Sequence, residues 1–225
     1  MAGRAPLAFV CDFDGTAVLL DIGDEICRRF APSAWDEFDR RLRAGELSLP
    51  EAQLRVWPLV RASEEAVLAY VDEIARFRDG FERFCGEAVA RGVRVLVASG
   101  GLDFYVRRVL TRLGPLSPSI EVIANLGRFR GGSIEVEFPH RYSLGCTRWG
   151  CAVCKGRVLR RLAEDGFETL FAGDGRSDRC AAGIAGRLFA VEDSPLARYC
   201  RAQGIACTSF RSFGELVPAL CDATG

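Results

Sequence analysis

The sequence predicts an α/β protein, a doubly wound parallel sheet with a small helical domain inserted near the N-terminus. Three observations predict this fold. An apolar run at residues 7–11 ends in two carboxylates and a glycine, residues 17–80 have helical periodicity throughout, and strand-like and helix-like segments alternate from residue 81 onwards. Because strands that alternate with helices are typical of parallel sheets, we expect a core of residues 1–16 and 81–225 and a helical domain of residues 17–80.

The first predicted strand leads into the motif Asp12-Phe13-Asp14-Gly15. Alternation along an extended chain places Asp12 and Asp14 on one face, with Cα atoms about 7 Å apart, and turns Phe13 into the core. Two adjacent carboxylates repel each other unless a cation lies between them, and Mg²⁺ accepts carboxylate and carbonyl oxygens. Gly15 allows a main-chain N–H to approach an anion. Taken alone, the motif is also compatible with solvated acids beside a turn glycine.

The helical segment carries recognisable start signals. Ser48-Leu-Pro-Glu51 predicts a capping box with proline in the first turn, and Ser63 predicts the N-cap of the last helix. The expected helices cover residues 21–31, 34–45, 49–61 and 64–77. We expect their apolar faces to form a small core of their own from Ile22, Ile26, Phe30, Trp35, Phe38, Leu42, Leu54, Trp57 and Leu68.

The remainder of the chain alternates between the two kinds of element. The expected strands are 93–98, 169–172, 188–191 and 205–208, with a hairpin of 120–125 and 133–138; the expected helices are 81–91, 102–113, 155–164, 179–185, 197–203 and 213–223.

At three further places, residues suited to binding or catalysis lie at the end of a strand or the start of a helix. Ser99-Gly100-Gly101 follows a strand and offers a hydroxyl and N–H groups, Lys155 begins a helix, and the segment from Asp174 to Asp178 follows another strand. Each alone is also compatible with an ordinary turn or helix cap. Because the carboxyl ends of parallel strands meet at one edge of the sheet, together they predict a binding site for an anion.

The composition excludes several classes of function. Thirty basic residues balance thirty acidic ones in 225 residues, which argues against a nucleic-acid partner. The apolar run at the N-terminus is too short for a secretory signal or a membrane anchor, so we expect a cytoplasmic protein without a membrane partner and with its ten cysteines reduced. The chain has one lysine, Lys155, and one histidine, His140, so histidine acid–base chemistry is confined to one place. The balanced charge implies no partner, and the sequence predicts no particular oligomeric state.

The four motifs, in this order, resemble those of the haloacid dehalogenase-like superfamily: DFDGT, a serine after a strand, a lysine, and GDGxxD. The helical insert after DFDGT resembles the small cap domain of the phosphoserine phosphatase-like branch. The resemblance implies that Asp12 is a nucleophile that forms an aspartyl-phosphate, that Asp14 is the general acid and base, and that Ser99 and Lys155 bind the phosphoryl oxygens. A carboxylate approaches a phosphate dianion only where positive charge screens both, which agrees with a lysine and a cation at this site.

The same resemblance implies a magnesium cofactor. Asp12, the main-chain carbonyl of Asp14, and Asp174 would bind Mg²⁺, with Asp178 in a supporting position. Backbone N–H groups near Phe13, Gly15 and Gly100 would help to neutralise the transferring group.

The resemblance implies that the substrate is a small phosphate ester, and it offers two candidates. Asp21 and Arg55 lie near the positions at which phosphoserine phosphatases bind the amine and the carboxylate, although Asp21 is also suited to cap a helix. The segment 146–155 and GDGRSDRCAA resemble a related branch typified by the methionine-salvage phosphatase, which acts on a phosphorylated methylthio diketone enol. We rank that branch first.

Other possibilities stay open. His140, Cys146, Cys151 and Cys154 offer four zinc ligands at irregular spacing, and the alternatives are a redox pair or a packed loop. A phosphotransferase or phosphomutase would share Asp12 and Asp14 but exclude water from the intermediate. A non-catalytic sensor of phosphorylated metabolites is disfavoured, because a binder does not need the nucleophile.

Overall fold

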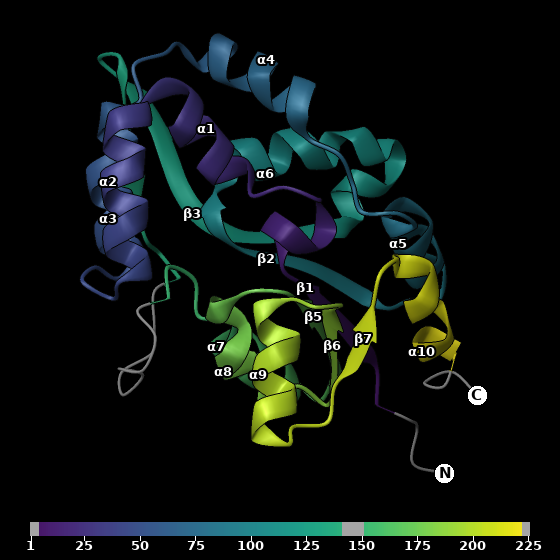
Figure 1. Ribbon diagram of the computed structural model, residues 1–225. Helices are drawn as coiled ribbons and strands as arrows, with labels where there is room; N and C mark the ends of the chain where they lie inside the picture. The colour runs from purple at the N-terminus through teal and green to yellow at the C-terminus, as the bar shows by residue number, and fades with distance from the viewer. Residues whose placement is uncertain (1–4, 141–150, 222–225) are drawn as a thin grey trace.

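The computed structural model describes residues 5–140 and 151–221. Within these residues, seven strands form one sheet in the order β4-β3-β2-β1-β5-β6-β7 (Figure 1). The strands are β1 (Leu7–Cys11), β2 (Arg94–Leu102), β3 (Ile120–Arg130), β4 (Ser133–Glu137), β5 (Glu168–Gly173), β6 (Arg187–Val191) and β7 (Thr208–Phe210).

The pairing of the strands confirms the predicted fold class. Every neighbouring pair is parallel except β3 and β4, which form an antiparallel hairpin. In the central register, Cys11 of β1 lies opposite Val97 of β2 and Ala172 of β5. The pairing of β1 with both neighbours therefore ends at the same level, which brings the residues that follow Cys11, Val97 and Ala172 to one edge of the sheet.

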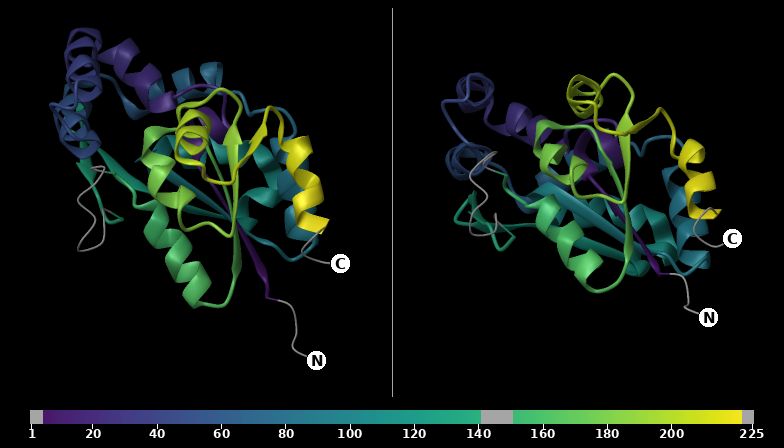
Figure 2. Two further views of the ribbon diagram at one scale, coloured as in Figure 1. Left: turned by 60° about the horizontal axis from the view of Figure 1, so that its bottom comes forward. Right: turned by 90° about the horizontal axis from the view of Figure 1, so that it is seen from below.

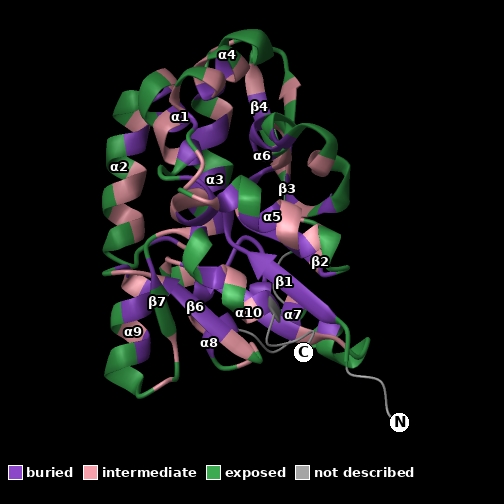
Figure 3. Cartoon of the chain, turned by 90° about the vertical axis from the view of Figure 1, so that its right-hand side faces the viewer, coloured by how far each residue is buried: buried purple, intermediate pink, exposed green. Residues whose placement is uncertain are grey.

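Alternation along β1 divides the core into two layers. Phe9 and Cys11 pack in a cluster with residues of α5 (Phe81–Ala90), α6 (Asp103–Leu110) and the C-terminal turn before α10 (Val217–Cys221). Ala8 and Val10 pack with α7 (Lys155–Glu164), α8 (Arg179–Ala182) and α9 (Pro195–Gln203). Figure 3 shows β1 buried along its length, as a strand covered by helices on both faces must be.

Four helices occupy the segment between β1 and α5. They are α1 (Ile22–Phe30), α2 (Pro32–Arg43), α3 (Leu49–Val56) and α4 (Glu64–Ile74). The predicted start signals are confirmed at α3, where Ser48 and Glu51 form a capping box, and at α4, where the Ser63 side chain accepts from the N–H of Ala66. Figure 2 shows α2 and α3 at the opposite end of the molecule from α10 in both views. Each helix of the described residues is too short or too polar to span a lipid bilayer.

The inserted helices share one hydrophobic cluster with the sheet domain, so the expectation that they form a separate core is wrong. Trp57, which is 2% exposed, stacks on Tyr105 and contacts Phe104 edge-on, and both of those residues belong to α6. Leu54, expected in the core, is 48% exposed. The insert therefore gains stability by packing on α6.

Several element ends differ from the expected ones. Helix α3 ends at Val56 because Pro58 lies in a short 3-10 turn that follows. Strand β2 continues to Leu102 across a register shift that starts at Ala98, so the serine and the two glycines lie within its irregular end. The last strand begins at Thr208 instead of residue 205, because Gly204 in the left-handed region and the bond from Ile205 N–H to Cys200 O extend the end of α9.

We expect the substitution Trp57→Ala to lower the free energy of unfolding by about 3–5 kcal/mol, because it removes a large buried side chain between the insert and α6. Urea unfolding monitored by circular dichroism measures this loss and should show a single transition. Leu54→Ala on the exposed face of α3 serves as the control and should change stability by less than about 0.5 kcal/mol. Two separate transitions in the wild-type protein would contradict the shared core.

Candidate active site

The loop after β1 adopts a conformation that requires glycine. Phe13–Ala17 forms a tight turn in which Gly15 has φ +73°, and a Cβ atom at this position would lie 2.7 Å from an oxygen of Asp174. Phe13 is fully buried, as predicted, and its N–H donates to Asp12 Oδ1 at 2.7 Å. The turn thus presents both aspartates at the level edge of β1, β2 and β5.

Lys155 lies between two carboxylates at the start of α7. Its Nζ is 2.7 Å from Asp12 Oδ1 and also pairs with Asp178 Oδ1, and all three side chains are buried. Burial alone would lower the pKa of Lys155, but Asp12 and Asp178 outweigh that effect and raise the pKa, so the ammonium stays charged. Burial and the nearby Asp178 raise the pKa of Asp12 despite Lys155. The ammonium of Lys155 therefore pairs with two carboxylates, those of Asp12 and Asp178.

Asp14 lies beside two hydroxyl groups and a backbone donor. Its Oδ1 accepts from the N–H of Ile22 at 2.8 Å, and its Oδ2 accepts from Tyr105 Oη at 3.0 Å and Ser99 Oγ at 3.3 Å. Burial raises the pKa of Asp14, the nearby Asp21 raises it further, and the hydrogen bonds only partly offset this. A carboxyl group with a raised pKa is suited to donate a proton near neutral pH.

Asp174 is oriented by the first motif. Its Oδ1 accepts from Thr16 Oγ1 at 2.9 Å, and Arg78 in turn donates to the carbonyl oxygens of Thr16 at 2.9 Å and Gly15 at 2.6 Å. Burial, and secondarily Asp178, raise the pKa of Asp174 to about 6. The loops after β1 and β5 are therefore connected through side chains.

Asp12, Asp174 and Asp178 each bring one oxygen within 4.8 Å of the others. Asp178 already uses Oδ1 for Lys155 and Oδ2 for the N–H groups of Asp174 and Gly175, so its main role is to fix the loop. Three crowded carboxylates, of which Asp12 and Asp174 have raised pKa values, share the single ammonium of Lys155, and such a set fits a hard divalent cation. Asp12 and Asp174 use Oδ1 for hydrogen bonds or ion pairs, and among the described residues the Oδ2 atom of each accepts no hydrogen bond.

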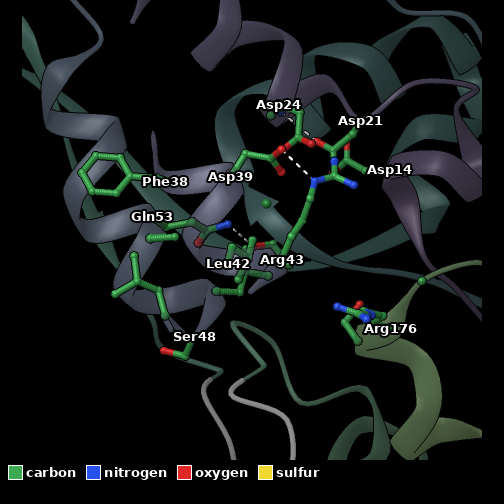
Figure 4. Close-up of a pocket in the computed structure, with 18 of the residues that line it drawn as sticks. Asp14, Asp21, Asp24, Phe38, Asp39, Leu42, Arg43, Ser48, Gln53 and Arg176 are labelled. Atoms are coloured by element: carbon green, nitrogen blue, oxygen red, sulfur yellow. Dashed lines mark hydrogen bonds and ion pairs between the residues drawn. The ribbon is translucent and has the colours of Figure 1, made fainter. Parts of the chain in front are cut away.

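A cavity of about 1210 Å³ lies above these residues. Asp12, Asp14, Lys155 and Asp174 line it on the side of the sheet, and α1, α2 and α3 line the opposite side. Figure 4 shows the Arg43 side chain extending from α2 towards Asp21, Asp24 and Asp39, and Arg43 Nε is 2.7 Å from Asp39 Oδ2. The inserted helices thus form the wall of the cavity opposite the strand ends.

The structure places the two expected substrate residues differently. Asp21 lines the cavity and also caps α1, accepting from the N–H of Asp24 at 2.8 Å, so both roles considered for it are compatible. Arg55 is exposed on α3 and does not line the cavity. The arginines that do line it are Arg43, Arg176 and Arg179. Residues two positions apart on an α-helix lie on different faces, so Arg55 does not face the cavity that Gln53 lines.

The cysteines near Lys155 are partly described. Cys146 lies outside the described residues, whereas Cys151 and Cys154 are buried, and the thiol of Cys180 hydrogen-bonds with both. His140 is exposed, and its carbonyl accepts from the N–H of Cys154 at 3.0 Å. Among the described residues, the one group with metal-binding spacing is the aspartate cluster, so the zinc hypothesis gains no support from Cys151, Cys154 and Cys180.

Three residues of the site escaped sequence reasoning. Thr16 is the last residue of the first motif, DFDGT, and its place in that motif was the available signal. Arg78 ends the insert and carries no signal of its own. Tyr105 reaches Asp14 because Gly101 has no side chain, and a Cβ atom there would lie 1.5 Å from the tyrosine hydroxyl. The double glycine was the available signal for such a close approach.

Comparisons with known proteins agree with this geometry. A curated 2-hydroxy-3-keto-5-methylthiopentenyl-1-phosphate phosphatase from Geobacillus kaustophilus is 30% identical over 216 residues, 95% of each chain. One from Bacillus mycoides is 28% identical over 211 residues, 93% of this chain and 94% of the relative. The activity in the names of these relatives is the one expected from the resemblance to the methionine-salvage phosphatase branch.

Solved structures show the same fold. A phospho-aspartyl intermediate analogue of phosphoserine phosphatase matches with a TM-score of 0.71 at 22% identity, covering 96% of this chain and 99% of the other. A substrate-bound phosphoserine phosphatase complex matches with a TM-score of 0.72 over the same shares. The family model of the haloacid dehalogenase-like hydrolases matches residues 9–183, and it confirms the resemblance found in the four motifs. The chain therefore belongs to the haloacid dehalogenase-like hydrolase family.

Proposed function

We propose that the protein is a magnesium-dependent phosphomonoesterase that acts on 2-hydroxy-3-keto-5-methylthiopentenyl-1-phosphate or a closely similar ester, with residues 17–80 as its cap. The observation that carries the proposal is the convergence of Asp12, Asp14, Lys155 and Asp174 on one cavity. The names of the relatives support the substrate.

The first half of the reaction transfers the phosphoryl group to the protein. A carboxylate oxygen of Asp12 attacks phosphorus, the bond to the ester oxygen breaks, and Asp14 donates its proton to the departing oxygen. Lys155 screens the charge of Asp12 and the phosphoryl oxygens, and Ser99 together with the N–H of Gly100 orients those oxygens. The expected contribution of the Gly15 N–H is not included, because this group donates to the carbonyl oxygen of Leu20 at 3.2 Å. The raised pKa of Asp14 keeps the required proton available.

The second half restores the protein. Asp14, now ionised, removes a proton from a water molecule, whose oxygen attacks phosphorus and releases Asp12 as a carboxylate and phosphate as product. A bound Mg²⁺ would neutralise charge on the phosphoryl oxygens, and Asp12, the Asp14 carbonyl and Asp174 are the groups that would bind it, with Asp178 fixing their loop.

The wall of the cavity supports an apolar, uncharged substrate tail. Phe38, Leu42 and Leu49 line the side formed by α2 and α3. Burial, followed by the nearby Asp21, raises the pKa of Asp24 to about 9, so this carboxyl is neutral at pH 7. The apolar side chains suit a methylthio chain, and the neutral carboxyl of Asp24 is suited to hydrogen-bond with hydroxyl and keto groups.

Phosphoserine phosphatase and phosphotransfer are the competing activities. The exposed position of Arg55 removes the residue expected to bind the phosphoserine carboxylate. Phosphotransfer or phosphomutase activity would yield product alcohol without an equal amount of free phosphate. Measurement of both products with the enol phosphate, phosphoserine and an aryl phosphate distinguishes the three activities.

We expect Asp12→Asn to lower phosphate release from p-nitrophenyl phosphate by roughly 10³-fold or more, because the amide is not a nucleophile for phosphorus. A phosphate assay with the purified variant checks this. Asp165→Asn at the exposed end of α7 is the matched control and should retain wild-type turnover. Wild-type turnover in Asp12→Asn would disprove the covalent mechanism.

We expect a chelator to abolish turnover and excess Mg²⁺ to restore it. Asp174→Asn should raise the Mg²⁺ concentration for half-maximal activity by about tenfold or more, because it removes a charged oxygen ligand. Magnesium titration of phosphate release measures both effects. An unchanged magnesium requirement in this variant would exclude Asp174 as a ligand.

We expect Asp24→Asn to stabilise the fold by about 1–2 kcal/mol at pH 8 and by much less at pH 4. With a folded pKa of about 9 and an unfolded pKa near 3.9, wild-type stability falls as pH rises through this window, since only the folded state keeps the proton. Urea unfolding at both pH values tests this, with Asp36→Asn on exposed α2 surface as the control. An equal effect at both pH values would refute the raised pKa.

A further inference from the structure

Gln53 connects the inserted helices to the irregular end of β2. It lies on α3, lines the cavity and is 9% exposed. Its Nε2 donates to the carbonyl oxygen of Gly100 at 3.0 Å, across 47 residues of sequence. A side chain of the insert therefore bonds directly to the segment proposed to bind phosphate.

The peptide unit between Gly100 and Gly101 is fixed at both ends. Its carbonyl oxygen also accepts from Asn125 Nδ2 of β3 at 2.8 Å, and its N–H donates to Ser99 Oγ at 2.9 Å. The same Ser99 hydroxyl lies 3.3 Å from Asp14 Oδ2. The orientation of this peptide therefore sets where the serine hydroxyl lies relative to the proposed general acid.

The other end of the Gln53 amide is not used by the fold. Its Oε1 is buried and makes no hydrogen bond with the described residues. A buried acceptor without a partner costs free energy, so an apolar side chain of similar shape would serve packing at least as well. The presence of an amide here points to a role of its donor group at Gly100.

We infer that Gln53 is a positioning residue that aligns Ser99 and Gly100 for phosphoryl transfer when α3 lies against the cavity. The inference rests on the proposed function. It assigns α3 a part in aligning the reacting groups as well as in enclosing the substrate. Loss of the donor should lower kcat more than it raises KM, because the bond acts on the alignment of groups around the phosphoryl group.

The decisive variant is Gln53→Glu, because a carboxyl group donates to the Gly100 carbonyl only when it is protonated. Burial raises the pKa of such a group towards neutrality. We expect kcat for p-nitrophenyl phosphate to approach the wild-type value near pH 5 and to fall about tenfold or more relative to wild type by pH 8. Gln203→Glu, at the exposed end of α9, is the matched control and should follow the wild-type pH profile.

Gln53→Met separates this effect from the titration of other groups. Methionine has a similar shape and no donor, so kcat should be lower by about tenfold at every pH while the free energy of unfolding is retained. Charged groups on the packed elements and across the cavity are the same in both variants: Asp39 and Arg43 of α2, Glu135 and Glu137 of β4, Asp14, and Lys155. A pH dependence in Gln53→Glu beyond that of Gln53→Met is therefore due to residue 53.

The amide ¹⁵N resonance of Gly101 gives a readout that does not depend on turnover, because this nitrogen shares a peptide unit with the Gly100 carbonyl. In Gln53→Glu it should show a titration step, with the midpoint seen in kcat, that is absent from wild type and from Gln53→Met. The titration of Asp14, which Ser99 connects to the Gly101 N–H, is common to all three proteins. Wild-type kcat in Gln53→Met, or the absence of the additional Gly101 titration step in Gln53→Glu, would overturn the inference. An inactive wild-type protein with a titrating resonance would instead refute the proposed function and leave the hydrogen bond confirmed.

Discussion

The buried ion pairs of Lys155 with Asp12 and Asp178 are the interaction on which the rest of the site depends. Buried charges are tolerated only when they are paired and hydrogen-bonded. Here one ammonium satisfies carboxylates from the loops after β1 and β5, and Asp178 uses its remaining oxygen for two backbone N–H groups. This network joins three segments that are far apart in sequence and leaves an excess of negative charge that calls for a cation.

The level register of the central strands makes the network possible. Cys11, Val97 and Ala172 lie side by side, so the next residues along each strand emerge at one edge. Close approach then requires the absence of side chains at two glycines. The lack of a side chain at Gly15 leaves room for the carboxylate of Asp174, and the lack of one at Gly101 leaves room for the hydroxyl of Tyr105. Backbone geometry and side-chain electrostatics are thus satisfied by the same residues.

The inserted helices are part of the same folding unit as the sheet. Trp57 packs on α6, and the shared hydrophobic cluster extends from β1 through α6 to α1 and α4. Because the insert is anchored in this way, the polar residues of α1 to α3 face the proposed phosphoryl site across a cavity of defined volume. Residues of the insert and residues of the strand ends therefore line opposite walls of one cavity.

The sequence by itself determined the fold class, the family and the residues at the strand ends, because buried strands, turn glycines and helix caps leave local patterns. Asp12, Asp14, Ser99, Lys155 and Asp174 were all found in this way and converge in the structure. Only the tertiary structure decided which side chains of the insert face the cavity. Arg55 points away whereas Arg43 and Gln53 line the wall, and Tyr105 reaches Asp14 from α6. These placements depend on how helices pack over long sequence separations, which local periodicity does not encode.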